Sequence, residues 1–282
     1  MFRKGVIHTM KIICSKSSLL KSVSIALKAV PSKTTMPILE CILMDATTNQ
    51  IKFTTNDMEL GIETIVEGTI EEKGKVALDA KIFYEIIRRL PDNDVTIKTD
   101  DKYAATITCE KAKFNIPGKS GEDFAYLPMI EKDEPLTISQ YTLKEMIRQT
   151  IFSIAVNENN KLMTGELFEI KNNCLKVVSL DGHRISIRKM SLKKDYSDRK
   201  VVVPGKTLSE VSKILSGEVD DQVSIYFTKN HILFEFDQTI VVSRLIEGEY
   251  FRINQMLSSD YETKFIINKK EYKGYFDSKR RT

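Results

Sequence analysis

Apolar residues recur every three to four positions in four segments of the chain and alternate with polar residues in most of the stretches between them. The helical period predicts helices at about 17–30, 79–90, 141–155 and 205–216. The alternating runs, bounded by turn residues such as Asn172-Asn173, predict strands. These strands are expected near 11–14, 38–46, 50–55, 60–68, 74–78, 94–99, 103–109 and 111–116 in the first half, and near 136–139, 164–171, 174–180, 184–190, 200–203, 222–227, 231–236 and 239–245 in the second. Because several antiparallel strands separate the helices, the pattern predicts an α+β fold in which each half packs two helices on antiparallel sheets.

This pattern occurs twice, at an offset of about 125 residues. Residues 75–90 are echoed by residues 200–215, and five positions are identical: Lys75/Lys200, Val76/Val201, Lys81/Lys206, Glu85/Glu210 and Leu90/Leu215. A short apolar strand followed by a helix start also recurs at 11–23, 136–147 and 264–276. The third occurrence stops within about ten residues of its helix start. A domain-sized repeat indicates one fold used more than once, here two complete copies and the start of a third.

The repeat defines the expected domains. Residues 10–130 form the first, 136–258 the second and 259–282 the start of a third, while residues 1–9 precede the repeat as an extension. A polar linker marked by Pro128 and Pro135 separates the first two domains. The third segment holds one strand and part of one helix, which cannot bury an apolar face by themselves, so we expect it to be frayed or loosely docked. A truncated or frame-shifted gene product is the origin that this pattern suggests.

The composition is that of an ordinary soluble protein, with 41% hydrophobic and 29% charged residues. No stretch reaches the roughly 18 apolar residues of a membrane span, and the first nine residues lack the apolar core of a secretory signal. A cytoplasmic protein with no membrane partner is expected. The net charge of +4 comes from the two ends, because residues 10–268 carry 35 basic and 37 acidic residues. A nucleic acid would therefore have to meet basic residues concentrated on one face.

The chain offers little for metal or redox chemistry. Cys14, Cys41, Cys109 and Cys174 lack CxxC spacing and lie in apolar, strand-like stretches, so we interpret them as buried reduced thiols. Only three histidines are present. We expect neither a metal site nor a cofactor.

Each predicted helix combines an apolar stripe with a charged face. The basic residues of these faces are Lys21 and Lys28, then Lys81, Arg88 and Arg89, then Lys144 and Arg148, and finally Lys206 and Lys213. A solvated face explains any one of them. Their recurrence at matching repeat positions in an acidic body favours the alternative hypothesis of a shared basic surface.

Several motifs, in this order, resemble the beta sliding clamps, the processivity subunits of bacterial DNA polymerase III. The motifs are Met36-Pro37-Ile38-Leu39, Asn56-Asp57-Met58-Glu59, Ser179-Leu180-Asp181-Gly182-His183-Arg184, Val203-Pro204-Gly205-Lys206 and Arg244-Leu245-Ile246-Glu247-Gly248-Glu249-Tyr250. The resemblance covers residues 10 to about 272. It implies a non-catalytic DNA sliding clamp that tethers the replicative polymerase to duplex DNA and confers processivity in chromosome replication.

The resemblance also implies an assembly and partners. In the family, two chains of three domains each close head to tail into a ring around duplex DNA, with helices lining the hole. Lys and Arg side chains on such helices meet phosphates whatever the base sequence. The implied protein partners are the DNA polymerase III alpha subunit, the clamp loader and other proteins with a clamp-binding peptide. Because the third domain supplies one side of the ring contact, we expect this chain not to close the homodimeric ring.

Candidate site residues follow from the resemblance, residue by residue. The DNA-contacting positions of the family are matched by Lys33, Lys81, Asn157, Lys161, Leu162 and Lys206. The second-domain half of a pocket that docks partner peptides is matched by Met163, Leu180, Gly182, His183, Arg184 and Ile185. In that pocket Met and Leu would form an adaptable apolar floor, and glycine would allow close backbone approach. One departure concerns this pocket, because Phe251-Arg252-Ile253 stands where the family usually has Pro-Asp-Tyr.

Two alternatives remain open. One is a non-ring scaffold that binds partner peptides without encircling DNA. The other is an enzyme, such as a nucleotidyltransferase or hydrolase, that uses Asp57 and Asp181, with Asp181 and His183 as an acid–base or metal pair. Because Asp57 and Asp181 occupy equivalent repeat positions, a shared turn-capping role is favoured over catalysis.

Overall fold

The computed structural model describes residues 9–156, 160–257, 262–263 and 266–268, and its elements follow the predicted α+β pattern. The first half contains β1 (Lys11–Ser15), α1 (Lys16–Ala26), η1 (Leu27–Ala29), η2 (Pro37–Glu40), β2 (Cys41–Asp45), β3 (Ile51–Asn56), β4 (Leu60–Val66), β5 (Thr69–Glu72), β6 (Lys75–Asp79), α2 (Ala80–Arg89), β7 (Asp94–Thr99), β8 (Ala105–Cys109), β9 (Ala112–Ile116), β10 (Gly118–Ser120) and η3 (Gly121–Asp123). The second half contains β11 (Leu136–Ser139), α3 (Gln140–Arg148), η4 (Ile151–Ser153), η5 (Lys161–Thr164), β12 (Gly165–Lys171), β13 (Cys174–Leu180), β14 (Ile185–Ser191), β15 (Arg199–Pro204), α4 (Gly205–Ile214), β16 (Gln222–Phe227), β17 (His231–Phe236) and β18 (Thr239–Arg244). The predicted fold class is therefore confirmed.

Some predicted boundaries were wrong. The predicted strand 38–46 begins only at Cys41, because the preceding residues form the 3₁₀ turn η2 with Pro37 in its first turn. The predicted helix 141–155 ends at Arg148. Two residues later Thr150 has a non-helical backbone and donates its hydroxyl to the carbonyl of Met146 at 2.8 Å, which favours a helix end.

Two short strands were missed in the first half. The predicted strand 60–68 ends at Val66, and β5 continues the chain as a separate strand that pairs with β1. Gly68 allows this crossing, since a Cβ there would lie 2.4 Å from the sulfur of Cys14. The other missed strand, β10, pairs with β6 at residues 118–120.

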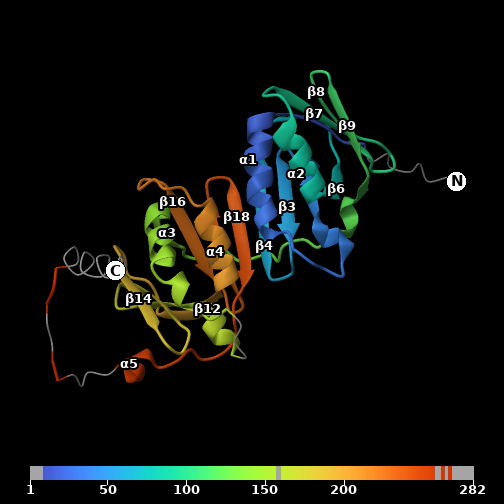
Figure 1. Cartoon of the computed structure of the whole chain (residues 1–282). Coiled ribbons are helices and arrows are strands. Elements are labelled where there is room, and N and C mark those ends of the chain that lie inside the picture. The colour runs from blue at the N-terminus through green and yellow to red at the C-terminus, as the bar shows by residue number, and fades with distance from the viewer. Residues whose placement is uncertain (1–8, 157–159, 258–261, 264–265, 269–282) are drawn as a thin grey trace, which may run out of the picture. The chain divides into compact units, whose positions relative to one another are not determined.

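The two repeats share one sheet. Nine antiparallel strands follow the order β10-β6-β2-β3-β4-β18-β17-β16-β11, and β4 of the first repeat pairs there with β18 of the second. The hydroxyls of Thr64 and Thr239 face each other at 3.0 Å across this junction. A five-stranded sheet, β5-β1-β7-β8-β9, completes the first repeat, and a four-stranded sheet, β14-β13-β12-β15, completes the second. Figure 1 shows α1 beside α2 and α3 near α4, each pair packed with the strands of its own repeat.

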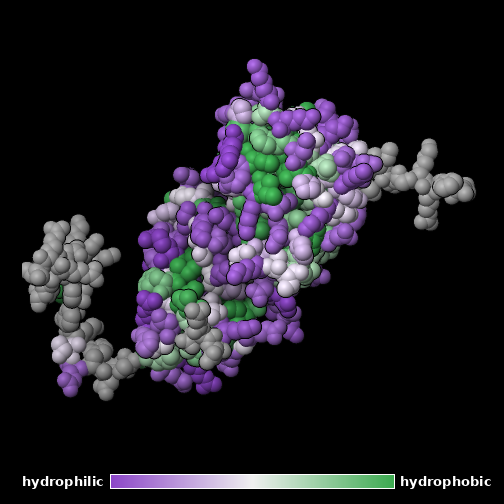
Figure 2. Space-filling model, turned by 45° about the vertical axis from the view of Figure 1, so that its right-hand side comes forward, coloured by the Kyte–Doolittle hydropathy of each residue, from purple (hydrophilic) through white to green (hydrophobic). Residues whose placement is uncertain are grey.

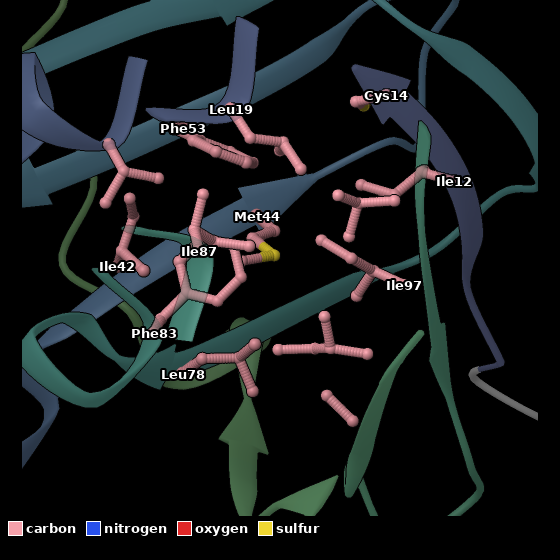
Figure 3. Close-up of a cluster of buried hydrophobic side chains, with 14 of the residues drawn as sticks. Ile12, Cys14, Leu19, Ile42, Met44, Phe53, Leu78, Phe83, Ile87 and Ile97 are labelled. Atoms are coloured by element: carbon pink, nitrogen blue, oxygen red, sulfur yellow. The ribbon is translucent and has the colours of Figure 1, made fainter. Parts of the chain in front are cut away.

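Each repeat has its own hydrophobic core between its helices and its two sheets. In the first core Leu19 and Phe83 of the helices meet Ile12 and Ile97 from one sheet and Phe53 from the other, and Figure 3 shows these side chains converging. The second core is built in the same way from α3, α4 and the strands of the second repeat. It also receives Ala29, Leu60 and Ile62 from the first repeat, so the junction at β4 and β18 is part of that core.

Buried hydroxyls repeat the same connection in both halves. Thr55 donates its hydroxyl to the carbonyl of Ala26, at the end of α1, over 2.5 Å. Ser179 donates to the carbonyl of Thr150, after the end of α3, over 2.5 Å. Donors and acceptors are both 124 residues apart in the chain. The duplication seen in the sequence therefore extends to individual hydrogen bonds.

The four cysteines lie in strands β1, β2, β8 and β13, and all are free thiols. Three are buried, as predicted, whereas Cys174 is half-buried beside the hairpin turn at Asn172-Asn173. Burial raises the pKa of the Cys14 thiol to about 12. No helix in the described part of the chain is both long and apolar enough to span a membrane.

The chain divides into two compact units, residues 1–248 and 249–282. The second unit contains the short helix α5 (Ile253–Met256). Of the strand predicted at 264–267, Ile266 and Ile267 are described and are not in a strand, while Lys264, Phe265 and the helix start at Tyr272 lie outside the described residues. The boundaries 10–130, 136–258 and 259–282 stay a prediction.

Candidate nucleic-acid and peptide interface

The lysines predicted to contact DNA are exposed. Lys33 lies between η1 and η2, and Lys161 begins η5, where the side chain of Asn160 accepts a hydrogen bond from the amide of Leu162 at 3.0 Å. Leu162 itself is half-buried. Lys81 and Lys206 are exposed at the second residues of α2 and α4. Asn157 lies outside the described residues.

Lys81 and Lys206 occupy equivalent positions in the two repeats, because a strand runs directly into each helix. β6 leads into α2 and β15 into α4 without a connecting loop. Further along, Arg88 pairs with Glu85 on α2 at 2.8 Å, and Lys213 pairs with Glu210 on α4 at 2.7 Å. Both pairs are exposed i,i+3 contacts, which neutralise part of the basic face of each helix. On α2 the exposed Lys81 therefore carries more of the positive charge available to a ligand than the paired Arg88.

Lys206 has a partner from the other repeat. Its ammonium group forms an ion pair with Asp57, which lies in the turn between β3 and β4. The Lys206 side chain is 60% exposed, whereas that of Asp57 is only 6% exposed. A residue predicted to contact DNA thus also bridges the two repeats.

Both candidate catalytic carboxylates cap turns. Asp57 accepts hydrogen bonds from the amides of Glu59 and Leu60, at 3.0 and 2.7 Å. Asp181 accepts from the amides of His183 and Arg184, both at 3.1 Å, and its second oxygen binds the Arg184 guanidinium at 2.8 Å. These bonds, led by the one from the His183 amide, hold the pKa of Asp181 below its usual range. The turn-capping interpretation is therefore confirmed, and His183 meets Asp181 through its backbone.

The peptide-pocket residues come from two segments of the second repeat. Leu180 is buried and pairs with Ile185 across the start of the β13–β14 hairpin, whose turn contains Gly182, His183 and Arg184. The guanidinium of Arg184 lies 5.7 Å from the centre of the exposed Phe152 ring. Met163 lies on η5, where its carbonyl accepts from the amide of Ala155 at 2.9 Å. The hairpin thus brings five of the six residues together.

Gly182 is explained by its own backbone. Its φ is +86°, and a Cβ at this position would meet no atom within 4 Å. Glycine is therefore favoured here by the left-handed turn, and no neighbour of the described chain crowds it. The equivalent residue of the first repeat is Met58, with a φ of 75°, so the same turn forms there at some conformational cost.

Sequence reasoning missed an apolar groove on the first repeat. It has a volume of about 340 Å³ and is lined by Lys81, Ile82, Glu85, Ile86, Arg89 and Phe114. Ile82 is 49% exposed and Phe114 40% exposed. Figure 2 shows such apolar areas on the surface, bordered by hydrophilic side chains. The groove lies between α2 and β9, the last strand of its sheet, so only the tertiary structure brings its two sides together.

A buried carboxyl group was missed as well. Glu166 lies on β12, on the core-facing side with Phe168 and Ile170, and it is fully buried. Neither of its carboxyl oxygens has a hydrogen-bond partner among the described residues. Burial raises the pKa of Glu166 to about 8, and the side chain of Thr150 lowers it by a smaller amount. The sequence held a signal, since the repeat places Glu166 where the first half has the buried Ile42.

Comparison with known proteins gives consistent matches. The profile of the N-terminal domain of the DNA polymerase III beta subunit matches residues 10–128, and that of its central domain matches residues 137–251. The beta sliding clamp of Bacillus subtilis strain 168 is 35% identical over 273 residues, which are 93% of this chain and 72% of that protein. A crystal structure of a putative DNA polymerase III beta subunit from Eubacterium rectale shares 68% identity with a TM-score of 0.88, over 90% of this chain and 69% of that one. The crystal structure of the Bacillus subtilis clamp shares 33% identity with a TM-score of 0.91, over 95% and 73% of the two chains.

Proposed function

Because the chain belongs to the DNA polymerase III beta subunit family, the beta sliding clamps, we propose that it is a DNA sliding clamp. It tethers the replicative polymerase to duplex DNA and confers processivity in chromosome replication, in the cytoplasm. The observation that carries this proposal is the pairing of β4 with β18, which joins two copies of one domain into a continuous sheet with equivalent helices. A surface of repeated units suits a ligand that itself repeats, such as the phosphate backbone.

The DNA contact is electrostatic and independent of base sequence. Lys33, Lys81, Lys161 and Lys206 come from four segments of the two repeats, and all are exposed. A flexible lysine ammonium can follow phosphates as the duplex moves, and it makes no bidentate contact that would fix one register. Leu162, which follows Lys161 in η5, belongs to the same proposed surface, and Asn157 is a proposed DNA contact that lies outside the described residues.

A salt titration tests this contact. We expect the full chain to bind a labelled duplex with an affinity that falls as salt rises and is the same for unrelated sequences. Lys33→Ala and Lys161→Ala should each reduce the slope of log K against log salt by about 0.9. Lys98→Ala, an exposed lysine on β7, is the matched control and should leave the slope unchanged. Absence of binding even at low salt would overturn the proposed function.

We further propose that the protein is a non-catalytic subunit. The two candidate catalytic carboxylates, Asp57 and Asp181, each accept hydrogen bonds from turn amides and form an ion pair with a basic side chain. We therefore expect the wild type, Asp57→Asn and Asp181→Asn to be equally inactive in nucleotidyltransferase and hydrolase assays. Metal-dependent turnover that disappears in either variant would favour the enzyme alternative.

The β13–β14 turn is proposed as part of a docking site for peptides of the DNA polymerase III alpha subunit, the clamp loader and other clamp-binding proteins. The exposed Phe152 ring, Arg184 above it and the open backbone at Gly182 give a peptide an apolar surface with polar groups beside it. Met163 adds a flexible side chain from η5. Phe152→Ala should weaken binding of a clamp-binding peptide in calorimetry, while Tyr141→Ala, an exposed ring on α3, serves as a control.

The groove between α2 and β9 is proposed as the contact for another clamp chain. β9 is the repeat equivalent of β18, because β7, β8 and β9 follow one another as β16, β17 and β18 do. In the second repeat β18 pairs with β4 of the neighbouring domain, whereas β9 is an edge strand with an apolar groove beside it. A clamp domain of a second copy would extend the sheet at β9 and cover Ile82 and Phe114. We still expect this chain by itself not to close the ring. Light scattering that shows a stable dimer, together with retention on circular but not on linearised duplex DNA, would overturn that expectation.

A further inference from the structure

An ion pair across the repeat junction bears on the basic surface. Lys206, at the start of α4, holds its ammonium group against Asp57 of the first repeat. The pair lies at the same junction as the β4–β18 pairing, since Asp57 lies in the turn that leads into β4 and the amide of Arg244, at the end of β18, donates to the carbonyl of Glu59 in that turn at 2.9 Å. The junction therefore fixes the position of Asp57 relative to Lys206.

The two oxygens of Asp57 have different tasks. Oδ1 accepts from the amides of Glu59 and Leu60 and so holds the turn, while Oδ2 holds Lys206. The equivalent carboxylate, Asp181, also uses Oδ1 for two turn amides, but its Oδ2 binds Arg184 of its own turn. Only the first of these two carboxylates thus reaches a lysine that is proposed to face DNA.

We propose that Asp57 competes with DNA phosphate for Lys206 and so sets the effective charge that the start of α4 presents to the duplex. This inference rests on the proposed function, because it concerns the strength of the same DNA contact. The Lys206 side chain is 60% exposed and can turn toward a phosphate, whereas the nearly buried Asp57 is held in place by its turn. A carboxylate fixed beside a mobile ammonium group lowers the free energy that is gained when the ammonium contacts a phosphate. Weaker individual contacts favour a clamp that moves along DNA over one that holds a fixed position.

Three substitutions in the full chain test the proposal by duplex binding across a salt series. Asp57→Asn keeps an acceptor for the turn amides and removes the charge beside Lys206, so the affinity should rise about 1.5-fold to fivefold at low salt, the range of an exposed ion pair. The magnitude of the salt slope should rise by about 0.9. Asp181→Asn adds the same unit of net charge at the equivalent turn and is the matched control, for which a smaller change is expected. Lys206→Ala should weaken binding, and Asp57→Asn added to Lys206→Ala should give no gain beyond that of the control substitution, because Asp57 then has no ammonium group to compete for.

The outcomes separate this inference from the proposed function. Wild-type chain that binds no duplex at any salt overturns the proposed function itself. Wild-type binding with equal effects of Asp57→Asn and Asp181→Asn overturns the competition, because a general charge effect then suffices. A gain from Asp57→Asn that is as large in the Lys206→Ala background as in the wild type also overturns it, since Asp57 would then act on DNA independently of Lys206. Circular dichroism melts of each variant show whether the junction has stayed folded.

Discussion

Glu166 should limit the stability of the second repeat in a way that depends on pH. Its carboxyl group is fully buried without a hydrogen-bond partner among the described residues, and burial raises its pKa to about 8 from an ordinary value of 4.5. In the unfolded chain the group ionises near pH 4.5, while in the folded chain it stays protonated until about pH 8. The folded state thus binds more protons in this window, so the stability falls as the pH rises from about 4.5 to 8 and then levels off.

The magnitude follows from the size of the pKa difference. Each unit of pKa is worth about 1.4 kcal/mol, so the cost relative to low pH reaches about 3 kcal/mol at pH 7 and about 5 kcal/mol above pH 8. Glu166→Gln keeps the shape of the side chain and removes its titration. We therefore expect the difference in unfolding free energy between this variant and the wild type to shift by about 3 kcal/mol in favour of the variant between pH 4.5 and 7.

Urea unfolding followed by far-UV circular dichroism measures this difference, since the chain has no tryptophan to report by fluorescence. Glu169→Gln is the matched control on the same strand, because Glu169 is partly exposed and pairs with Lys176 at 3.1 Å. Its effect should be small and nearly constant from pH 5 to 8. A difference between Glu166→Gln and the wild type that stays flat over this range would refute the reasoning, because it would mean that Glu166 is already ionised in the fold.

Three further predictions concern the turns, the helix ends and the groove. Met58→Gly should stabilise the fold by roughly 1 kcal/mol in thermal melts, because a left-handed φ costs a non-glycine residue about that much free energy. Gly182→Ala should destabilise the fold for the same reason. A loss of stability in Met58→Gly would contradict the prediction. Thr55→Val and Ser179→Ala should each destabilise by about 1–3 kcal/mol in urea unfolding, since each leaves a buried carbonyl without its donor, and a similar loss at both positions would match their equivalence. Phe114→Asp should lower the mass of any assembly seen by light scattering at a given concentration without changing the circular dichroism spectrum, and an unchanged mass would exclude β9 as the contact.

The sequence by itself determined the local elements and their duplication. Helix and strand periods depend on neighbouring residues, so the positions of α2, β13 and β18 followed from the pattern of apolar residues alone. The equivalence of Asp57 and Asp181 followed from the repeat, and the turn-capping role that it predicts is confirmed at both turns. Where the prediction was wrong, as at the end of α3, a side-chain hydrogen bond of Thr150 ended a helix that periodicity extended.

The tertiary structure alone decided which distant residues meet. The pairing of β4 with β18, the ion pair of Lys206 with Asp57, and the groove between α2 and β9 each join residues from different parts of the chain. Periodicity carries no information about such partners, because it records which face of an element is buried and not what covers it. Glu166 shows the same limit, since it lies inside the predicted strand 164–171 and the pattern of that strand does not tell what covers its carboxyl group. The repeat does indicate that Glu166 is buried, because the equivalent residue Ile42 is buried. The loss of hydration and the raised pKa of Glu166 arise only when the second core closes around its carboxyl group.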